Sequence, residues 1–259
     1  MRSYPRIVGE TGGKDFIVAH PDCDKRALTV ALLRGAFEFQ GQKCSAASRA
    51  YIPESVWDEI KDEYCAEVSK IRMGDPRDFS NFMSAVIDRK SFDNITGYID
   101  RAKEDPSCEI VTGGGYDDKT GYFIEPTTIL CKDSRYESMA EEIFGPVLSI
   151  HIYPDSDFER ILEVCDSTSE YALTGSIFAT DRRNIETALK ALRFSAGNFY
   201  INDKPTGAVV GQQPFGGARG SGTNDKAGSP LNLLRWVSPR SIKETFAPPH
   251  DWTYGFLKE

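Results

Sequence analysis

The chain has 259 residues, of which 40% are hydrophobic and 27% charged, and it carries a formal net charge of −8. This composition is typical of a globular protein with a substantial core, and the negative charge argues against a nucleic-acid partner. No apolar run reaches about 18 residues and no charged-then-apolar leader follows Met1, so we expect neither a membrane span nor a secretion signal.

Strand-like and helix-like segments alternate along the chain, which is typical of an α/β sheet covered by helices. Residue patterns predict helices at about 24–39, 53–73, 92–102, 158–165 and 185–192. They predict strands at 49–52, 109–111, 127–130, 147–153, 173–178 and 198–202. The sequence shows no internal repeat and no linker long enough to divide the chain into independent domains.

Cys44 follows the first predicted helix, within the polar segment 41–49 (GQKCSAASR). An isolated cysteine is usually an inert apolar filler, but one placed just beyond a helix is open to solvent. We expect Lys43 and the amides of any helix opening after Gly41 to lower the thiol pKa and raise the thiolate fraction. Glu10, in the segment 9–14 (GETGGK), is the candidate base.

The other cysteines lie at least 21 residues from each other and from Cys44, at Cys23, Cys65, Cys108, Cys131 and Cys165. Zinc sites and thioredoxin-type motifs use close pairs, so we expect no metal. Isolated thiols in a chain of this size favour a reducing compartment. The three histidines lie far from Cys44 in sequence. A Cys-His protease dyad is an alternative that the fold could still create, but nothing in the sequence supports it.

Two glycine-rich stretches differ in context. Residues 113–115 run into Tyr116 rather than into a helix, which predicts a turn and not a phosphate cradle. Residues 206–222 concentrate glycines around Phe215, and such a segment lets backbone amides approach an anion. An ordinary irregular connection is an equally good interpretation of the second stretch.

Four separated motifs carry a family resemblance: GETGGK with Glu10, GQKCS with Cys44, EEIFGPV at 141–147, and PFGG at 214–217 followed by Ser221 and Gly222. In this order and spacing they resemble the aldehyde dehydrogenase superfamily, from about Tyr4 to the end. Segments 37–45, 199–204 and 211–219 most resemble its branch that oxidises glutamate γ-semialdehyde, formed from Δ1-pyrroline-5-carboxylate, to glutamate in proline catabolism. The resemblance implies an open, twisted, mostly parallel sheet with helices on both faces. Residues 1–235 would form the catalytic domain and 236–259 a C-terminal arm.

The resemblance also implies a role for each motif residue. Cys44 would attack the aldehyde to give a thiohemiacetal, which passes hydride to NAD⁺ and leaves a thioester. Glu10 would activate the water that releases glutamate, a role that suits a carboxylate whose pKa is raised by burial. Glu142 would hold the nicotinamide ribose hydroxyls, and Phe144 would pack against the cofactor.

The substrate-binding residues implied by the resemblance lie near Cys44 or in the second glycine-rich stretch. The hydroxyl of Ser45 and the amides of Gly207 and Ala208 would anchor the α-carboxylate of the small-molecule substrate, and Phe215 would line the aliphatic part of the pocket. Without the motifs, Glu142 would be interpreted as a solvated charge and the two phenylalanines as core packing.

Members of this superfamily are roughly twice as long, with a Rossmann-type cofactor domain ahead of the GETGGK segment. We expect this domain to be absent here. The oxyanion-hole asparagine that precedes that segment in the family would then be absent as well. The chain alone would then have little or no NAD-dependent activity. The alternatives are a non-catalytic α/β module for binding or assembly, and a residual thiol-dependent esterase.

The segment from Trp236 onward is too aromatic for a free tail, and we expect it to dock on another chain or domain. The resemblance implies a homo-oligomer, a dimer, for the full-length protein. It implies the mitochondrial matrix for a eukaryotic source and the cytoplasm for a bacterial one.

Overall fold

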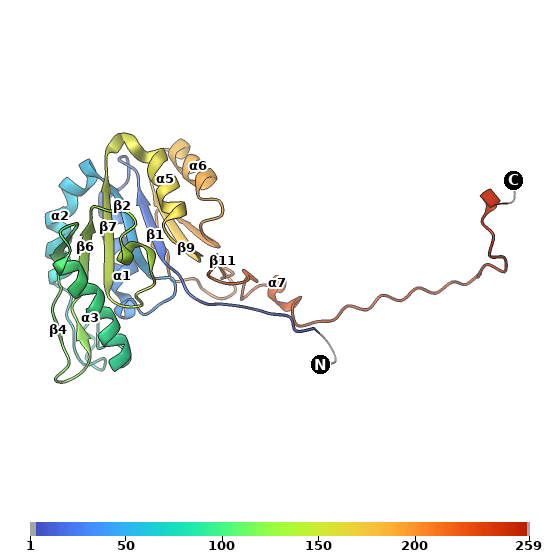
Figure 1. Ribbon diagram of the computed structural model, residues 1–259, viewed down its shortest axis with the longest axis horizontal. Helices are drawn as coiled ribbons and strands as arrows, with labels where there is room; N and C mark the ends of the chain where they lie inside the picture. Colours follow the sequence, from blue (N-terminus) through green and yellow to red (C-terminus); the bar gives the residue numbers. More distant parts are fainter. Residues whose placement is uncertain (1–3, 258–259) are drawn as a thin grey trace.

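A seven-stranded sheet runs through the computed structural model, which describes residues 4–257 (Figure 1). The strand order is β10-β9-β1-β2-β7-β6-β3. Neighbours are parallel except β3, which is antiparallel to β6 at one edge. The predicted mostly parallel sheet is therefore confirmed, with strands β1 (Asp15–Ala19), β2 (Ala47–Pro53), β3 (Cys108–Thr112), β6 (Thr127–Cys131), β7 (Val147–Tyr153), β9 (Thr174–Phe178) and β10 (Asn198–Ile201).

Helices cover both faces of this sheet, as predicted (Figure 1). Phe16 and Val18 of β1 point into one buried cluster, and Ile17 and Ala19 point into the other, because successive residues of a strand face opposite sides. The first cluster is closed by α3 (Arg89–Glu104), α5 (Phe158–Ser167) and α6 (Arg182–Ala191), and the second by α1 (Lys25–Phe37) and α2 (Glu54–Ser69).

The end of α1 determines where Cys44 lies. The predicted helix stops at Phe37, because Phe39 and Gln40 adopt positive φ within a 3₁₀ turn, η1 (Glu38–Gly41). Gly41 has a φ of +64°, and a Cβ on it would lie 2.2 Å from the carbonyl oxygen of Gly145. This close approach joins the segment that leads to Cys44 to the EEIFGPV segment.

Strand β1 lies in the middle of the sheet, yet the sequence analysis predicts no element there. Its five residues are all buried, so they show a short apolar run without the alternation of a half-exposed strand. Shorter elements also fall outside the predictions: β4 (Tyr116–Asp117), β5 (Phe123–Ile124), β8 (Tyr171–Ala172), β11 (Ala218–Arg219), α4 (Glu137–Ala140), α7 (Pro230–Leu233), η2 (Asp155–Asp157) and η3 (Gly255–Leu257).

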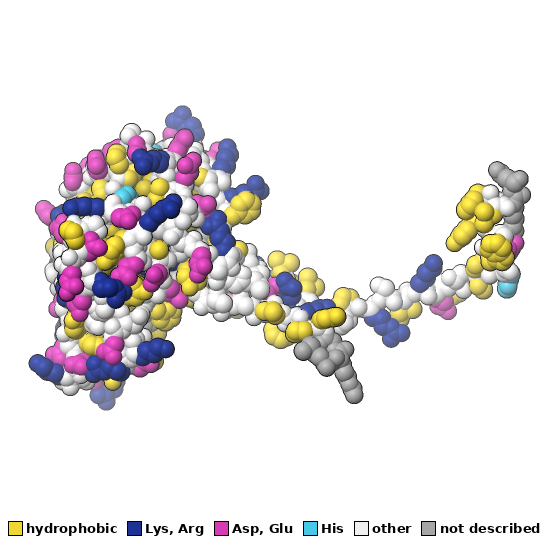
Figure 2. All heavy atoms as spheres, viewed as in Figure 1, with side chains coloured by type: hydrophobic (Ala, Val, Ile, Leu, Met, Phe, Trp, Pro, Cys, Tyr) yellow, Lys and Arg dark blue, Asp and Glu magenta, His cyan; other side chains and the backbone are white. Residues whose placement is uncertain are grey.

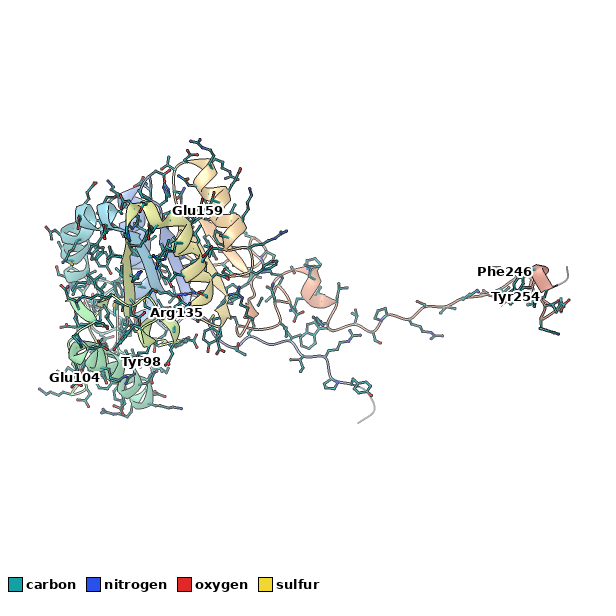
Figure 3. The ribbon with its side chains drawn as sticks, turned by 45° about the horizontal axis from the view of Figure 1, so that its top comes forward. Tyr98, Glu104, Arg135, Glu159, Phe246 and Tyr254 are labelled. Carbon is teal, nitrogen blue, oxygen red and sulfur yellow. The ribbon has the colours of Figure 1, made fainter. Side chains whose placement is uncertain are left out.

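The chain leaves the sheet after α7 and extends away from it (Figure 1). Hydrophobic side chains follow this extension (Figure 2), and Figure 3 labels Phe246 and Tyr254 near its far end. Trp236, Phe246 and Trp252 are 72%, 90% and 84% exposed. Arg6 donates hydrogen bonds to the carbonyl oxygens of residues 234, 235 and 237, so the two terminal segments run together here.

No helix within residues 4–257 has both the length and the apolar character needed to cross a membrane.

Candidate active site

Cys44 lies in the turn between η1 and β2, in the wall of a pocket of about 640 Å³. The thiol residue is half-buried, so the expected access from solvent is present. The pocket brings together six of the eight predicted site residues, Cys44, Ser45, Phe144, Gly207, Ala208 and Phe215. Gln42, Lys43, Thr206, Val210, Gln213, Ala227 and Gly228 complete its lining.

The GETGGK segment passes directly beside this pocket. Glu10 pairs with Gly222 in an antiparallel bridge, and the Thr11 amide donates to the Ser221 carbonyl oxygen at 3.1 Å. A Cβ on Gly13 would lie 2.2 Å from the Cys44 carbonyl oxygen, so only glycine fits between the two segments. All four motifs are therefore in contact through their backbones or across one pocket, since Phe144 of EEIFGPV also lines it.

Glu142, in the EEIFGPV motif, is held by the GETGGK segment. Its Oε1 accepts a hydrogen bond from the Gly13 amide at 2.8 Å, and a Cβ on Gly12 would lie 2.7 Å from its Oε2. Glu142 lines a separate pocket of about 420 Å³, with Tyr98, Ala140, Glu141, Thr168, Ser169, Glu170 and Tyr171. The GETGGK segment thus connects the thiol pocket to the Glu142 pocket.

Phe144 turns from the Glu142 segment into the thiol pocket. Its φ is +59°, an uncommon value for a bulky residue, and its side chain is 42% exposed. Phe215 is half-buried in the opposite loop and exchanges backbone hydrogen bonds with Ala227. Neither aromatic side chain is buried in the core, so core packing does not account for them.

The predicted lowering of the Cys44 pKa is wrong. Burial raises the pKa of this thiol, and the negative charges of Asp15, Glu10 and Glu142 raise it further. The Lys43 ammonium does not offset them, because it forms an ion pair with Glu38 at 3.0 Å. No helix opens after Gly41 either, since residues 43–46 form turns and bends that lead into β2.

Burial raises the pKa of Glu10, against the nearby Lys226 charge, which lowers it. The direction is the one that a water-activating carboxylate needs. Lys226 also donates to the carbonyl oxygens of Gly197 at 2.6 Å and Gly216 at 3.1 Å, so it ties the PFGG loop to the start of β10. Lys226 carries no signal in the sequence, because its partners are 10 and 29 residues away.

A buried hydroxyl pair lies at the floor of the thiol pocket. Ser45 Oγ and Thr206 Oγ1 are 2.8 Å apart, and both side chains are nearly inaccessible. Two hydroxyls hold two hydrogens and spend one on this bond, so the other can be donated to an anion. Gly207, with φ of +98°, follows directly. Thr206 is not among the predicted site residues. Its position directly before Gly207, which is predicted, is the sequence signal that could have identified it.

Three buried charged residues underlie the site: Lys14, Asp15 and Arg49. Burial lowers the pKa of Lys14 to about 7 and raises the pKa of Asp15 to about 8. Lys14 Nζ and Asp15 Oδ2 have no hydrogen-bond partner in the described structure. Arg49 instead donates from Nε to the Lys14 carbonyl oxygen at 2.9 Å. The burial of Lys14 and Asp15 could not be predicted, since no strand is predicted at β1, whereas Arg49 begins the predicted strand 49–52.

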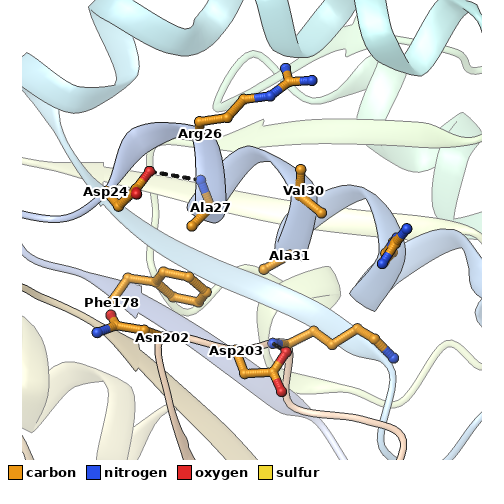
Figure 4. A pocket seen from close by; sticks show the side chains of 10 residues that line it. Asp24, Arg26, Ala27, Val30, Ala31, Phe178, Asn202 and Asp203 are labelled. Atoms are coloured by element: carbon orange, nitrogen blue, oxygen red, sulfur yellow. Dashed lines mark hydrogen bonds between the residues drawn. The ribbon is translucent and has the colours of Figure 1, made fainter.

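A further pocket of about 420 Å³ lies beside α1 and holds none of the predicted site residues. Figure 4 shows Asp24 in its wall, where the side chain accepts a hydrogen bond from the Ala27 amide at 2.9 Å and caps the helix. Within residues 4–257, no group of three or more His, Cys, Asp or Glu side chains could hold a metal ion.

A half-buried thiol and a glycine-rich loop at one pocket, with carboxylates close enough for their charges to act on the thiol, are typical of enzymes that work through a covalent cysteine intermediate. Residues 1–242 match the aldehyde dehydrogenase family. The chain belongs to this family, as the motifs predict.

Relatives and solved structures agree on one branch of the family. The chain is 62% identical to the mitochondrial delta-1-pyrroline-5-carboxylate dehydrogenase of Dictyostelium discoideum, covering 99% of this chain and 46% of that protein. It is 51% identical to the human mitochondrial protein of the same name, covering 100% of this chain and 46% of that protein. A crystal structure of the Mycobacterium tuberculosis delta-pyrroline-5-carboxylate dehydrogenase bound with NAD has a TM-score of 0.90 at 56% identity, covering 99% of this chain and 46% of that one. The chain therefore spans about half the length of the relatives it matches.

Proposed function

We propose that this chain carries the catalytic part of an NAD-dependent dehydrogenase that oxidises L-glutamate γ-semialdehyde to L-glutamate. The observation that supports this most is the common pocket of Cys44, Ser45, Gly207 and Ala208. The substrate has an aldehyde at one end and an α-carboxylate at the other. A thiol and a set of anion-binding donors in one pocket match those two ends.

The residues of the pocket divide the chemistry between them. Cys44 Sγ attacks the aldehyde carbon and then holds the acyl group. The raised pKa of Cys44 means that the thiol must lose its proton as it attacks. Glu10 removes a proton from the water that releases the acid, and the raised pKa of this carboxyl suits it to that transfer.

The Glu142 pocket fits the ribose of NAD. Glu142 Oε1 is held by the Gly13 amide, so the carboxylate is fixed as an acceptor beside a pocket of about 420 Å³. Carboxylates bind ribose hydroxyls in this way in other dinucleotide sites. When bound, NAD⁺ supplies the hydride acceptor that the oxidation requires. Phe144 would pack against it from the thiol pocket.

Residues 1–235 act as the catalytic unit in this proposal, and residues 236–259 form an arm for subunit or interdomain contact. The support is the exposed apolar side chains of that arm, including Trp236 and Phe246. A homodimer of the full-length protein would cover them. Light scattering that shows a monomer at micromolar concentration would exclude this assembly.

The compartment follows from the relatives by analogy. The Dictyostelium and human relatives are named mitochondrial. We propose the mitochondrial matrix if the source is eukaryotic and the cytoplasm if it is bacterial, which fractionation of source cells would test.

Protection of Cys44 from iodoacetamide tests the substrate proposal. Glutamate γ-semialdehyde should slow alkylation of Cys44 at concentrations where acetaldehyde has no effect, because only the former offers an α-carboxylate. In the Ser45→Ala variant, the concentration of glutamate γ-semialdehyde needed to protect Cys44 should rise by about 10-fold or more, the usual cost of a lost hydrogen bond to a charged group. Mass spectrometry of the labelled peptides gives the rate at each cysteine.

Cys65 is the internal control, because this half-buried thiol lies outside the pocket lining. Equal protection of Cys44 by the two aldehydes would contradict the proposal that the pocket binds the α-carboxylate of the substrate. Equal protection of Cys65 would show non-specific reaction with the aldehyde.

A further inference from the structure

Two cysteines face each other at the antiparallel edge of the sheet, away from the active-site motifs. Cys108 of β3 is the register partner of Cys131 of β6. The Lys132 amide donates to the Ser107 carbonyl oxygen at 2.9 Å, which makes residues 107 and 132 the hydrogen-bonded pair. The next pair, 108 and 131, is then a non-hydrogen-bonded one, where Cα atoms approach to about 4.5 Å.

This spacing lies within the range that a disulfide bridges, about 4.4–6.8 Å between Cα atoms. Residues directly opposite each other in a ladder point to the same face. Cys131 belongs to the buried cluster under α3, and Cys108 packs against that same cluster. The two thiols are close enough for each to affect the pKa of the other. The two side chains therefore lie on one face of the sheet, at a backbone spacing that a disulfide can bridge.

We propose that Cys108 and Cys131 form a reversible oxidation site, in which a peroxide joins the two sulfurs across the sheet edge and loosens α4.

The two thiols differ in exposure, and this difference gives them different roles in the oxidation. Cys108 is half-buried and within reach of a small oxidant, whereas Cys131 is 2% exposed. Burial raises the pKa of Cys108, and the Ser107 hydroxyl, whose oxygen lies 3.9 Å from the Cys108 sulfur, offsets part of this effect. Burial raises the pKa of Cys131 to about 12, so this residue keeps its proton. Because Cys108 is the more exposed of the two, it is the sulfur that attacks, and Cys131 is the one that resolves.

The reaction balances as a two-electron oxidation of the dithiol. The Cys108 thiolate attacks one peroxide oxygen, the O–O bond breaks, and the products are a sulfenic acid and hydroxide. The Cys131 sulfur then attacks Cys108 Sγ, the S–O bond breaks, and the leaving hydroxide takes the Cys131 proton as water. Two thiols and one hydrogen peroxide give one disulfide and two waters.

Formation of the Cys108–Cys131 disulfide changes the contacts of α4. Cys131 Sγ lies 3.7 Å from Ser138 Oγ, and the Ser138 hydroxyl, which is fully buried, also accepts from Ser149 Oγ at 2.7 Å. A sulfur turned toward Cys108 leaves the Ser138 hydroxyl without its acceptor. A buried hydroxyl without a partner is unfavourable, so α4 should open more often in the oxidised chain.

The test treats the full chain with hydrogen peroxide under native conditions, blocks free thiols and digests with trypsin. Cleavage at Lys119 separates the two cysteines, so the disulfide appears as a cross-linked pair of peptides lighter by two hydrogens. We expect this pair to form, to disappear with dithiothreitol, and to be accompanied by faster amide hydrogen exchange in residues 137–140.

Cys65→Ser is the matched control and should leave the cross-link unchanged, since Cys65 lies in a helix outside the strand pair. Cys131→Ala should remove the cross-link and leave a sulfenic acid on Cys108 that dimedone traps. Oxidation of Cys108 to sulfinic acid with Cys131 still free in the wild-type chain would overturn the proposal. Unchanged exchange at α4 in the cross-linked chain would overturn its second half.

A trivalent arsenical gives a measurement that needs no variant. Phenylarsine oxide bridges two thiols held close together, so it should protect Cys108 and Cys131 together from iodoacetamide in the reduced wild-type chain. Protection of one without the other would show that the two sulfurs are not within bridging distance.

Discussion

Gly13→Ala should slow the reaction of Cys44 with a carbonyl substrate by about 10²-fold or more, the usual cost of a displacement near 1 Å at a reacting centre. A Cβ on residue 13 would lie 2.2 Å from the Cys44 carbonyl oxygen and 2.4 Å from Asp15 Oδ2. The first of these atoms is backbone and cannot rotate away. The segment must shift, and it takes with it the Gly13 amide that holds Glu142.

The rate of Cys44 acylation by an activated ester measures this effect, with circular dichroism to show that the chain is folded. Gly9→Ala is the matched control in the same segment, because its Cβ would only make an ordinary contact, 3.7 Å from Thr223 Cγ2. Similar rates for the two variants would contradict the proposed packing of the segment against Cys44.

Lys14→Met should stabilise the fold by on the order of 3 kcal/mol at pH 7. Burial lowers the pKa of Lys14 from 10.5 to about 7, and its Nζ has no hydrogen-bond partner in the described structure. Between these two pKa values the unfolded chain binds a proton that the folded chain does not. Wild-type stability therefore rises with pH across this window, and the cost of burying Lys14 is largest at pH 7 and below.

Urea denaturation of both proteins at several pH values checks this prediction. The free energy of unfolding of Lys14→Met should exceed that of the wild type by the full amount below pH 7, and the difference should decrease toward pH 10.5. Asp15 titrates in the opposite sense in both proteins, because burial raises its pKa to about 8. Lys90→Met, at an exposed position of α3, is the control and should change little. A difference that is independent of pH would mean that Lys14 is not the titrating group.

The alternation of segments predicted most of the sheet, because strands such as Val147–Tyr153 lie between helices with clear apolar faces. β1 was missed because a fully buried strand lacks the alternation on which such a prediction depends. The irregular turn at Phe39 and Gln40 also has no signal in residue type. It follows from the packing of Gly41 against Gly145.

The motif residues were predictable, but their electrostatics were not. Lys43 is next to Cys44 in sequence, yet its charge is paired with Glu38. The carboxylates that raise the Cys44 pKa come from positions 10, 15 and 142, which only the fold brings together. Lys226 was missed for the same reason, since it acts through contacts with distant segments.

The release of nitrophenolate from p-nitrophenyl acetate tests Cys44 and Glu10 together, without any cofactor. The wild-type chain should give a burst of one nitrophenolate per chain, followed by slow turnover. Glu10→Gln should keep the burst, lower the turnover by about 10²-fold or more, and accumulate an acyl group that mass spectrometry finds on Cys44. An acyl group on another residue, or unchanged turnover in Glu10→Gln, would contradict the roles proposed for this thiol and this carboxylate.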